Sequence, residues 1–305
     1  MAIWNLGSIN IDHVYRLGHL PRPGETLAAS SYVQGLGGKG ANQSVAAACA
    51  GADTHHLGAM GPADDWVIDR LSRRGVVTTD ILRIKDQTTG HAIILLDAGA
   101  ENAIVIHPGA NRAIRPEMLA GPLSEIAPGD TLMVQNETSC QVEAAQAARQ
   151  AGARVIYSAA PFDIDAVRAI LPHVSILAMN AGEAEALFAA IPGDLPVEGL
   201  LITRGGEGAE YRDLASGTVH RQAAFPVDPV DTTGAGDTFA GYFAACLDQG
   251  DTIPQALRLA SAAAALKVTR NGAGEAIPTR AEVLDFLAAC RADQPAGQPA
   301  GQPSE

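Results

Sequence analysis

The stretch Asp231-Thr232-Thr233-Gly234-Ala235-Gly236-Asp237-Thr238-Phe239 governs how the rest of the chain is interpreted. Gly234 and Gly236 permit a tight turn, and the small apolar residues behind them have helical spacing. These features predict a glycine loop that opens a helix, with Asp237 in its first turn. Unpaired N–H groups and the helix dipole favour anions at such a terminus. Asp237 is therefore either a helix cap or a base beside a bound phosphate.

Length and composition favour a globular α/β protein. The chain has 305 residues, which suits one large domain or two ordinary ones. Its net charge of -13 argues against nucleic acid or an anionic membrane as the main partner. No apolar run approaches membrane-spanning length, and residues 1–6 do not resemble the start of a signal peptide. Because the four cysteines are scattered without a CxxC pair, we expect free thiols and a cytoplasmic location.

The middle of the chain alternates between buried strands and helices. The expected elements are a strand over 131–135, a helix over 140–150, a strand over 154–157, a helix over 163–171, a strand over 175–178 and a helix over 181–189. This spacing predicts a parallel sheet covered on both faces, with ligands at the carboxyl ends of its strands. Polar residues follow these strand ends at Asn136, Glu137, Ser158, Asn180 and Glu183. The helix dipole alone is an alternative explanation for Glu183.

Two short β-like segments and a hairpin are expected outside this sheet. They cover 13–17, 28–34, 89–96 and 102–107. Together they predict a small antiparallel sheet, a lid or an interface formed by about 13–35 and 88–108. Just before it, Ser8, Asn10 and Asp12 either share one face of an extended segment or form a polar turn. The tail 293–305 repeats Ala-Gly-Gln-Pro and is expected to be disordered, which leaves one domain over 1–292.

A second glycine cluster precedes a helical segment near the N-terminus. Gly35, Gly37 and Gly40 satisfy GxGxxG, but they follow a long polar excursion instead of the first strand, so a dinucleotide site is disfavoured. The cluster is also no P-loop, because Gly40 stands where Ser or Thr should follow Lys39. It predicts close approach of the backbone to a small polar ligand, with Asn42 pointing at that ligand. The alternative is a tight turn that carries a surface lysine.

Taken together, these segments resemble the ribokinase-like (PfkB) family of sugar and nucleoside kinases. Two stretches match the family's main signatures: Gly37–Asn42 matches GGKGAN and Asp231–Asp237 matches DTxGAGD. Further matches are Gly7–Asp12 (GSxNxD), Pro21–Thr26 (PxPGET), His107–Asn111 (HxGAN) and Asn180–Glu183 (NxxE). The likeness runs through residues 1 to 290 in unbroken order, so chance matching is a poor explanation.

The resemblance implies a fold and an activity. The fold is a three-layer α/β sandwich, with a mostly parallel central sheet flanked by helices and a small β-sheet lid. The activity is transfer of the γ-phosphoryl group of ATP, with Mg²⁺, to a hydroxyl of a small sugar; we expect D-ribose, giving ribose 5-phosphate. A nucleoside, fructose or another pentose is the alternative substrate, and a sugar-binding protein without catalysis is the alternative from another class. We also expect a homodimer formed through the lids.

The resemblance also assigns roles by position. Asp237 would be the base, and the amides of Gly234, Ala235 and Gly236 would form an anion hole. The residues that would hold the sugar are Asn10, Asp12, Gly38, Lys39, Asn42, Glu137 and Asp237. The nucleotide would meet Asn180, Thr203, Gly205 and Gly208, with Glu183 holding Mg²⁺ through water. Asp231 and Thr233 match the family's monovalent cation site, but Ala276 offers no side-chain oxygen there, so we expect modest potassium dependence.

Overall fold

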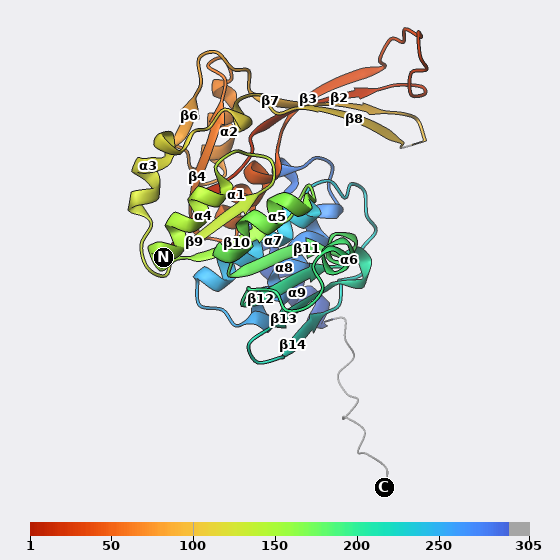
Figure 1. Cartoon of the computed structure of the whole chain (residues 1–305). Helices are drawn as coiled ribbons and strands as arrows, with labels where there is room; N and C mark the ends of the chain where they lie inside the picture. The colour runs from red at the N-terminus through yellow and green to blue at the C-terminus, as the bar shows by residue number, and fades with distance from the viewer. Residues whose placement is uncertain (100, 293–305) are drawn as a thin grey trace.

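The computed structural model describes residues 1–99 and 101–292, as a layered body from which a small sheet projects (Figure 1). The strands of the main sheet are β1 (Ala2–Leu6), β4 (Asp53–Met60), β5 (Val76–Val77), β6 (Ile81–Arg83), β9 (Thr131–Gln135), β10 (Arg154–Ser158), β11 (Ile176–Asn180), β12 (Gly199–Thr203), β13 (Ala209–Asp213) and β14 (Val219–Gln222). Their order is β14-β13-β12-β11-β10-β9-β1-β4-β5, with β6 beside β4. All neighbours are parallel except at one edge, where β13 and β14 run antiparallel. The expected mostly parallel sheet is confirmed.

Helices cover both faces of this sheet. They are α1 (Lys39–Cys49), α2 (Asp65–Arg73), α3 (Pro116–Glu125), α4 (Gln141–Gln150), α5 (Ile164–Ile170), α6 (Ala181–Ala190), α7 (Ala235–Asp248), α8 (Ile253–Val268) and α9 (Arg280–Ala292). Successive strand residues point to opposite faces, so Met133 packs with α1, α7 and α8 while Leu132 packs with α4, α5 and α6. Both residues are fully buried, which explains why the central strands are continuously apolar.

Small residues let two of the helices, α1 and α7, approach each other closely. A Cβ on Gly241 of α7 would lie 2.4 Å from the carbonyl oxygen of Gln43 in α1. The backbones of α1 and α7 therefore touch at this point, as glycine alone allows. This contact fixes the start of α1 relative to the start of α7, and the two helix starts carry the glycine loops identified in the sequence.

The projecting sheet comprises β2 (Asn10–Arg16), β3 (Ser31–Gly37), β7 (Gly90–Leu96) and β8 (Asn102–His107), in the order β3-β2-β7-β8 (Figure 1). The expectation of an antiparallel sheet is wrong in one pairing, because β2 and β7 run parallel. No hairpin joins these two strands, so no turn dictated their direction. β2 also begins earlier than expected, which makes Asn10 and Asp12 residues of a strand and excludes the polar-turn alternative.

Some expected features fall at the margins of the structure. The predicted turn between β7 and β8 includes residue 100, and the predicted tail 293–305 follows α9; these residues lie outside the described part of the chain. Among the helices that the structure describes, none is both long and apolar enough to cross a membrane. The four cysteines at positions 49, 140, 246 and 290 are free thiols, as expected.

Candidate active site

The stretch from Asp231 to Phe239 forms the predicted loop and helix start. Gly234 precedes α7 with a left-handed φ of 73°, a conformation that favours glycine, and Ala235 is the first helical residue. Asp237 lies in the first turn but makes no capping hydrogen bond. The helix-cap interpretation of Asp237 is therefore wrong, since its carboxylate is engaged elsewhere.

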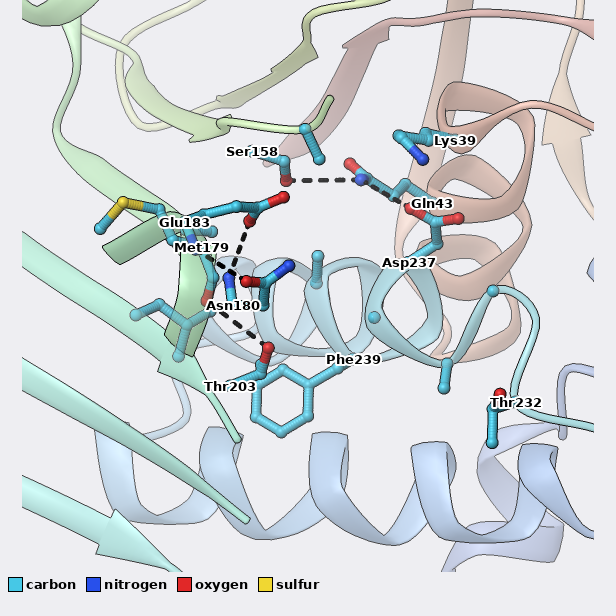
Figure 2. A pocket seen from close by; sticks show the side chains of 17 residues that line it. Lys39, Gln43, Ser158, Met179, Asn180, Glu183, Thr203, Thr232, Asp237 and Phe239 are labelled. Carbon is cyan, nitrogen blue, oxygen red and sulfur yellow. Dashed lines mark hydrogen bonds between the residues drawn. The ribbon is translucent and has the colours of Figure 1, made fainter. Parts of the chain in front are cut away.

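Two side-chain amides from α1 hold the carboxylate of Asp237, and Figure 2 shows the one that belongs to Gln43. Asn42 Nδ2 lies 3.1 Å from Oδ2, and Gln43 Nε2 lies 3.1 Å from Oδ1. Removal from bulk solvent raises the pKa of Asp237, while Lys39 and the two amides oppose that rise. The result is an oriented carboxylate whose affinity for a proton is increased.

Gln43 is a site residue to which sequence reasoning gave no role. Its Nε2 also lies 3.4 Å from Ser158 Oγ, and its Oε1 accepts a hydrogen bond of 2.8 Å from Gln135 Nε2. Gln43 thus links the start of α7 to the ends of β9 and β10. The sequence did offer one sign of this role, because Gln43 directly follows Asn42 near the start of a predicted helix.

A second group of charges gathers beside Asp237. Glu137 lies behind the end of β9, where its Oε1 is 3.7 Å from Lys39 Nζ and its Oε2 accepts bonds from Lys39 N, at 3.2 Å, and from Ser8 Oγ. Burial, and then the charge of Glu137, raise the pKa of Asp12 to about 6, against the effect of Lys39. Burial disfavours the charged form of Lys39, but Glu137, Asp237 and Glu183 raise its pKa above the ordinary value.

The glycines before α1 are explained by packing against the chain itself. Gly38 has a φ of 95°, and a Cβ there would lie 2.8 Å from the carbonyl oxygen of Ser8. A Cβ on Gly37 would overlap the carboxylate of Asp12. The glycines allow close approach of the backbone, but the partners found in the structure are Ser8 and Asp12 of the same chain, and the predicted approach to a polar ligand stays a prediction.

Asn10 is positioned by Asn111, a second residue to which sequence reasoning assigned no separate role. Asn111 Nδ2 donates to Asn10 Oδ1 at 2.9 Å and to the carbonyl oxygen of Ile9 at 3.0 Å, while its Oδ1 accepts from Ile9 N at 2.9 Å. One buried side chain thereby fixes both the backbone and the side chain at the point where β2 leaves the main body.

Asn180 and Glu183 meet at the carboxyl end of β11. Asn180 Oδ1 accepts from Glu183 N at 2.9 Å, and Glu183 Oε2 accepts from Asn180 N at 2.8 Å, which is a capping box. Both side chains also line a cavity that contains Lys39, Ser158 and Asp237 (Figure 2). Burial raises the pKa of Glu183, against the Asn180 N–H and Lys39. A capping role and a ligand-binding role are compatible here.

A second cavity of about 460 Å³ adjoins the first. The two share Thr203, Thr232, Ala235, Gly236 and Phe239, so the start of α7 lies between them. The walls of the second cavity include the other two predicted nucleotide residues and several apolar side chains: Gly205, Gly208, Phe225, Pro226, Val227, Ala264 and Val268. A polar cavity thus continues into a mainly apolar one.

The structure therefore brings most of the predicted residues to one edge of the sheet. Asp237, Asn42, Lys39 and Glu137 are linked by direct contacts or by a shared neighbour. Neither cavity is lined by Asn10, Asp12, Gly38, Asn42 or Glu137, which lie beside the first cavity, nor by Asp231 and Thr233, where the Asp231 carboxylate accepts from the backbone N–H of Thr233. Asp231 and Thr233 form a separate cluster in the loop that directly precedes Gly234.

Comparison with known proteins agrees with this geometry. The model of the pfkB family of carbohydrate kinases matches residues 3–280. A ribokinase from Haemophilus influenzae is 36% identical over 299 residues, covering 92% of this chain and 97% of the relative. The structure of ribokinase from Thermotoga maritima superposes with a TM-score of 0.86 at 32% identity, covering 94% of this chain and 99% of that one. Ribokinase from Arabidopsis thaliana, complexed with ribose and ATP, gives 0.85 at 29% identity, with coverage of 94% and 99%. The chain therefore belongs to the pfkB family of carbohydrate kinases, and it is a phosphotransferase that uses a sugar hydroxyl as acceptor.

Proposed function

We propose that this protein transfers the γ-phosphoryl group of ATP to D-ribose, giving ribose 5-phosphate and ADP, and that residues 1–292 act as one kinase domain. The observation that carries the proposal is the position of Asp237. It lies at the start of a helix, between the charged group of Asp12, Lys39 and Glu137 and the two connected cavities. The similarity to ribokinases, one of them complexed with ribose and ATP, supports ribose as the sugar.

In the proposed reaction, Asp237 is the general base. It takes the proton from the sugar hydroxyl as that oxygen bonds to the γ-phosphorus, while the bond from phosphorus to the bridging oxygen of ADP breaks. Its raised pKa brings its proton affinity closer to what a base needs near neutral pH. Asn42 and Gln43 keep the carboxylate in one orientation. The raised pKa follows from the burial of Asp237, and the fixed orientation follows from its two amide contacts.

The N-terminus of α7 is the proposed anion hole. The amides of Gly234, Ala235 and Gly236 precede the first intrahelical hydrogen bonds, and Gly234 to Gly236 line the first cavity; the N–H of Ala235 also donates to the carbonyl oxygen of Thr232 at 3.2 Å. Phosphoryl transfer needs positioning and charge stabilisation more than covalent chemistry. Fixed N–H groups that point at the transferring group supply such stabilisation without reorganisation.

The sugar is proposed to bind between the lid and the main sheet. A small sugar offers several hydroxyls and little apolar area, so its recognition requires hydrogen bonds. The proposed contacts are Asn10, Asp12, Gly38, Lys39, Asn42 and Glu137. A site built on such bonds strongly rejects an analogue that lacks one hydroxyl, because a buried polar group is then left unpaired.

The two connected cavities are the proposed ATP site. The phosphates would lie in the polar cavity with Asn180, and the nucleoside in the apolar cavity with Thr203, Gly205 and Gly208. In the part of the chain that the structure describes, no three His, Cys, Asp or Glu side chains are grouped to hold a metal ion. The carboxylate of Glu183 is suited to hold Mg²⁺ through a bound water, and the ion would take its other ligands from phosphates and further waters.

We further propose that two copies associate through their lids. Strand alternation places Val33, Ile104 and Ile106 on the same face as Asp12, and their side chains are 60%, 51% and 56% exposed. Such apolar surface on a projecting sheet indicates an interface. A second copy of the same sheet would cover it symmetrically. The four free thiols support a reducing compartment, and we place the protein in the cytoplasm.

A nucleoside substrate has weaker support. Tyr15 and Tyr32 are the lid aromatics that could stack on a base, and they pack against each other with ring centroids 4.9 Å apart. Both lie on the face of the lid opposite to Asp12. The lid therefore offers the sugar side no aromatic platform from these two residues.

A coupled assay of ATP consumption over a panel of pentoses, hexoses and nucleosides tests the proposal. We expect the highest kcat/KM with D-ribose. A higher value with a nucleoside or with fructose would contradict ribose as the substrate. Absence of turnover with every member of the panel would contradict the kinase assignment itself.

A further inference from the structure

Lys267 is a buried lysine beneath the loop that leads into the glycine turn. It lies in the last turn of α8, and its side chain is 0% exposed. Its ammonium donates a hydrogen bond of 2.8 Å to the carbonyl oxygen of Asp231 and lies 4.0 Å from the carboxylate oxygen Oδ1 of the same residue. Burial lowers the pKa of Lys267, and Asp231 opposes that change. A buried ammonium of this kind requires a compensating anion, which Asp231 provides.

Asp231 and its immediate neighbour Val230 are hydrogen-bonded to three segments of backbone, two of them through the Asp231 carboxylate. Oδ1 accepts from Thr233 N at 2.9 Å, and Oδ2 accepts from Gly272 N at 2.9 Å. The amides of Val230 and Asp231 in turn donate to the carbonyl oxygen of Val268 at the end of α8. Burial works against ionisation of Asp231, but the Thr233 and Gly272 N–H groups and Lys267 lower its pKa. The loop before Gly234 is therefore fixed by the ion pair between Lys267 and Asp231 and by the hydrogen bonds of Asp231.

A bound monovalent cation fits these residues poorly. Both carboxylate oxygens of Asp231 already accept backbone N–H bonds, and the ammonium of Lys267 holds its carbonyl oxygen. A second cation beside Asp231 would be repelled by Lys267. Ala276 offers no side-chain oxygen to compensate. The expectation of a potassium site at Asp231 and Thr233 thus disagrees with the arrangement found.

We propose that Lys267 is a positioning residue that serves as an internal cation, so that this enzyme needs no potassium. The ammonium would fix Asp231, and through Thr233 the backbone of Gly234 to Gly236, in the geometry that receives the phosphoryl group. This inference rests on the proposed role of that loop as an anion hole. Lys267 touches no substrate in this account; it acts through the loop.

The wild-type enzyme provides the first test. Its kcat is measured at equal ionic strength in potassium, sodium and tetramethylammonium chloride, and its melting temperature is measured in the same salts. We expect kcat in the three salts to agree within about twofold, a factor that ordinary salt effects can produce, and no potassium-specific rise in melting temperature. Activation by potassium of more than about fivefold, beyond what ionic strength explains, would overturn the inference.

Two variants separate an internal cation from a merely structural lysine. Lys267→Ala leaves space for an ion, and Lys267→Met fills it. Loss of a charged hydrogen bond should lower kcat of both about tenfold or more without potassium, with the sugar KM unchanged. Potassium should then restore Lys267→Ala but not Lys267→Met, and should raise the melting temperature of Lys267→Ala alone. Lys85→Met, at an exposed lysine, is the matched control.

The outcomes distinguish this inference from the proposed function. If no substrate is turned over, the proposed function fails, and the potassium-specific change in melting temperature still decides the role of Lys267. If both variants keep wild-type kcat in the absence of potassium, Lys267 does not position the loop. If the variants do not fold, the salt series on the wild-type protein alone decides.

Discussion

Replacing Asp12 by asparagine should stabilise the sugar-free protein at neutral pH. Asp12 lies on β2 beside Gly37, where burial and the charge of Glu137 raise its pKa from 3.8 to about 6. Because one pKa unit corresponds to about 1.4 kcal/mol, this difference makes the ionised carboxylate cost about 3 kcal/mol. An asparagine side chain at this position carries no charge and therefore avoids that cost.

The sign of the effect sets its dependence on pH. The folded protein holds the proton of Asp12 more tightly than the unfolded chain does, so the cost is absent below the ordinary pKa of 3.8 and complete above about pH 6. The stability gained by Asp12→Asn should therefore be near zero at the acidic end and rise to about 3 kcal/mol by pH 7. Urea unfolding followed by circular dichroism between these limits measures it.

The same change should weaken sugar binding, since the carboxylate is a proposed acceptor for sugar hydroxyls. Loss of a hydrogen bond to a charged group should raise the KM for the sugar about tenfold to a hundredfold. Asp285→Asn, at an exposed aspartate of α9, is the matched control and should change neither quantity. A destabilised Asp12→Asn at pH 7, or a stability difference that does not vary with pH, would refute the reasoning.

Three further predictions concern other parts of the structure. Gly38→Ala places a Cβ 2.8 Å from Ser8 O at a φ of 95°, and should cost about 2 kcal/mol or more in thermal unfolding; an unchanged melting temperature would show that the backbone can adjust. Ile106→Lys on the lid should yield monomers in sedimentation velocity without lowering the melting temperature, and a persistent dimer would exclude this face as the interface. Glu183→Gln should raise the Mg²⁺ concentration for half-maximal activity about tenfold. It should hardly change stability, because glutamine keeps an oxygen for the capping box, and an unchanged Mg²⁺ requirement would contradict the role of Glu183.

The fold was predictable wherever local pattern and topology agreed. β9 matched its predicted bounds because its five apolar or buried residues form one uninterrupted run between turns. The edge strands β13 and β14 were missed because they are short and rich in charged or polar residues, and the helix α3 was missed because Gly121 and Pro122 lie inside it. The parallel pairing of β2 with β7 joins segments that are far apart in sequence, and no local signal records it.

In the site, too, local motifs were predictable, whereas contacts between residues far apart in the sequence were not. Asp237, Asn42 and Glu183 stand in recognisable motifs, so sequence alone predicted that they would lie near one another at the carboxyl edge of the sheet, as they do. The structure adds Gln43, whose partners Asp237 and Ser158 lie 194 and 115 residues away. Lys267 was hidden within a helix whose buried side is otherwise mostly alanine, and only its contact with Asp231 makes it notable.

The most direct test of the central claim is turnover and ribose binding by Asp237→Asn. Asparagine keeps the size of the side chain but cannot accept the proton of the sugar hydroxyl, and general base catalysis contributes about a hundredfold to ten-thousandfold. We predict that kcat falls by at least about a hundredfold, while calorimetry shows ribose binding within about fivefold of the wild-type affinity. A kcat within about tenfold of wild type would contradict the assignment of Asp237 as the base.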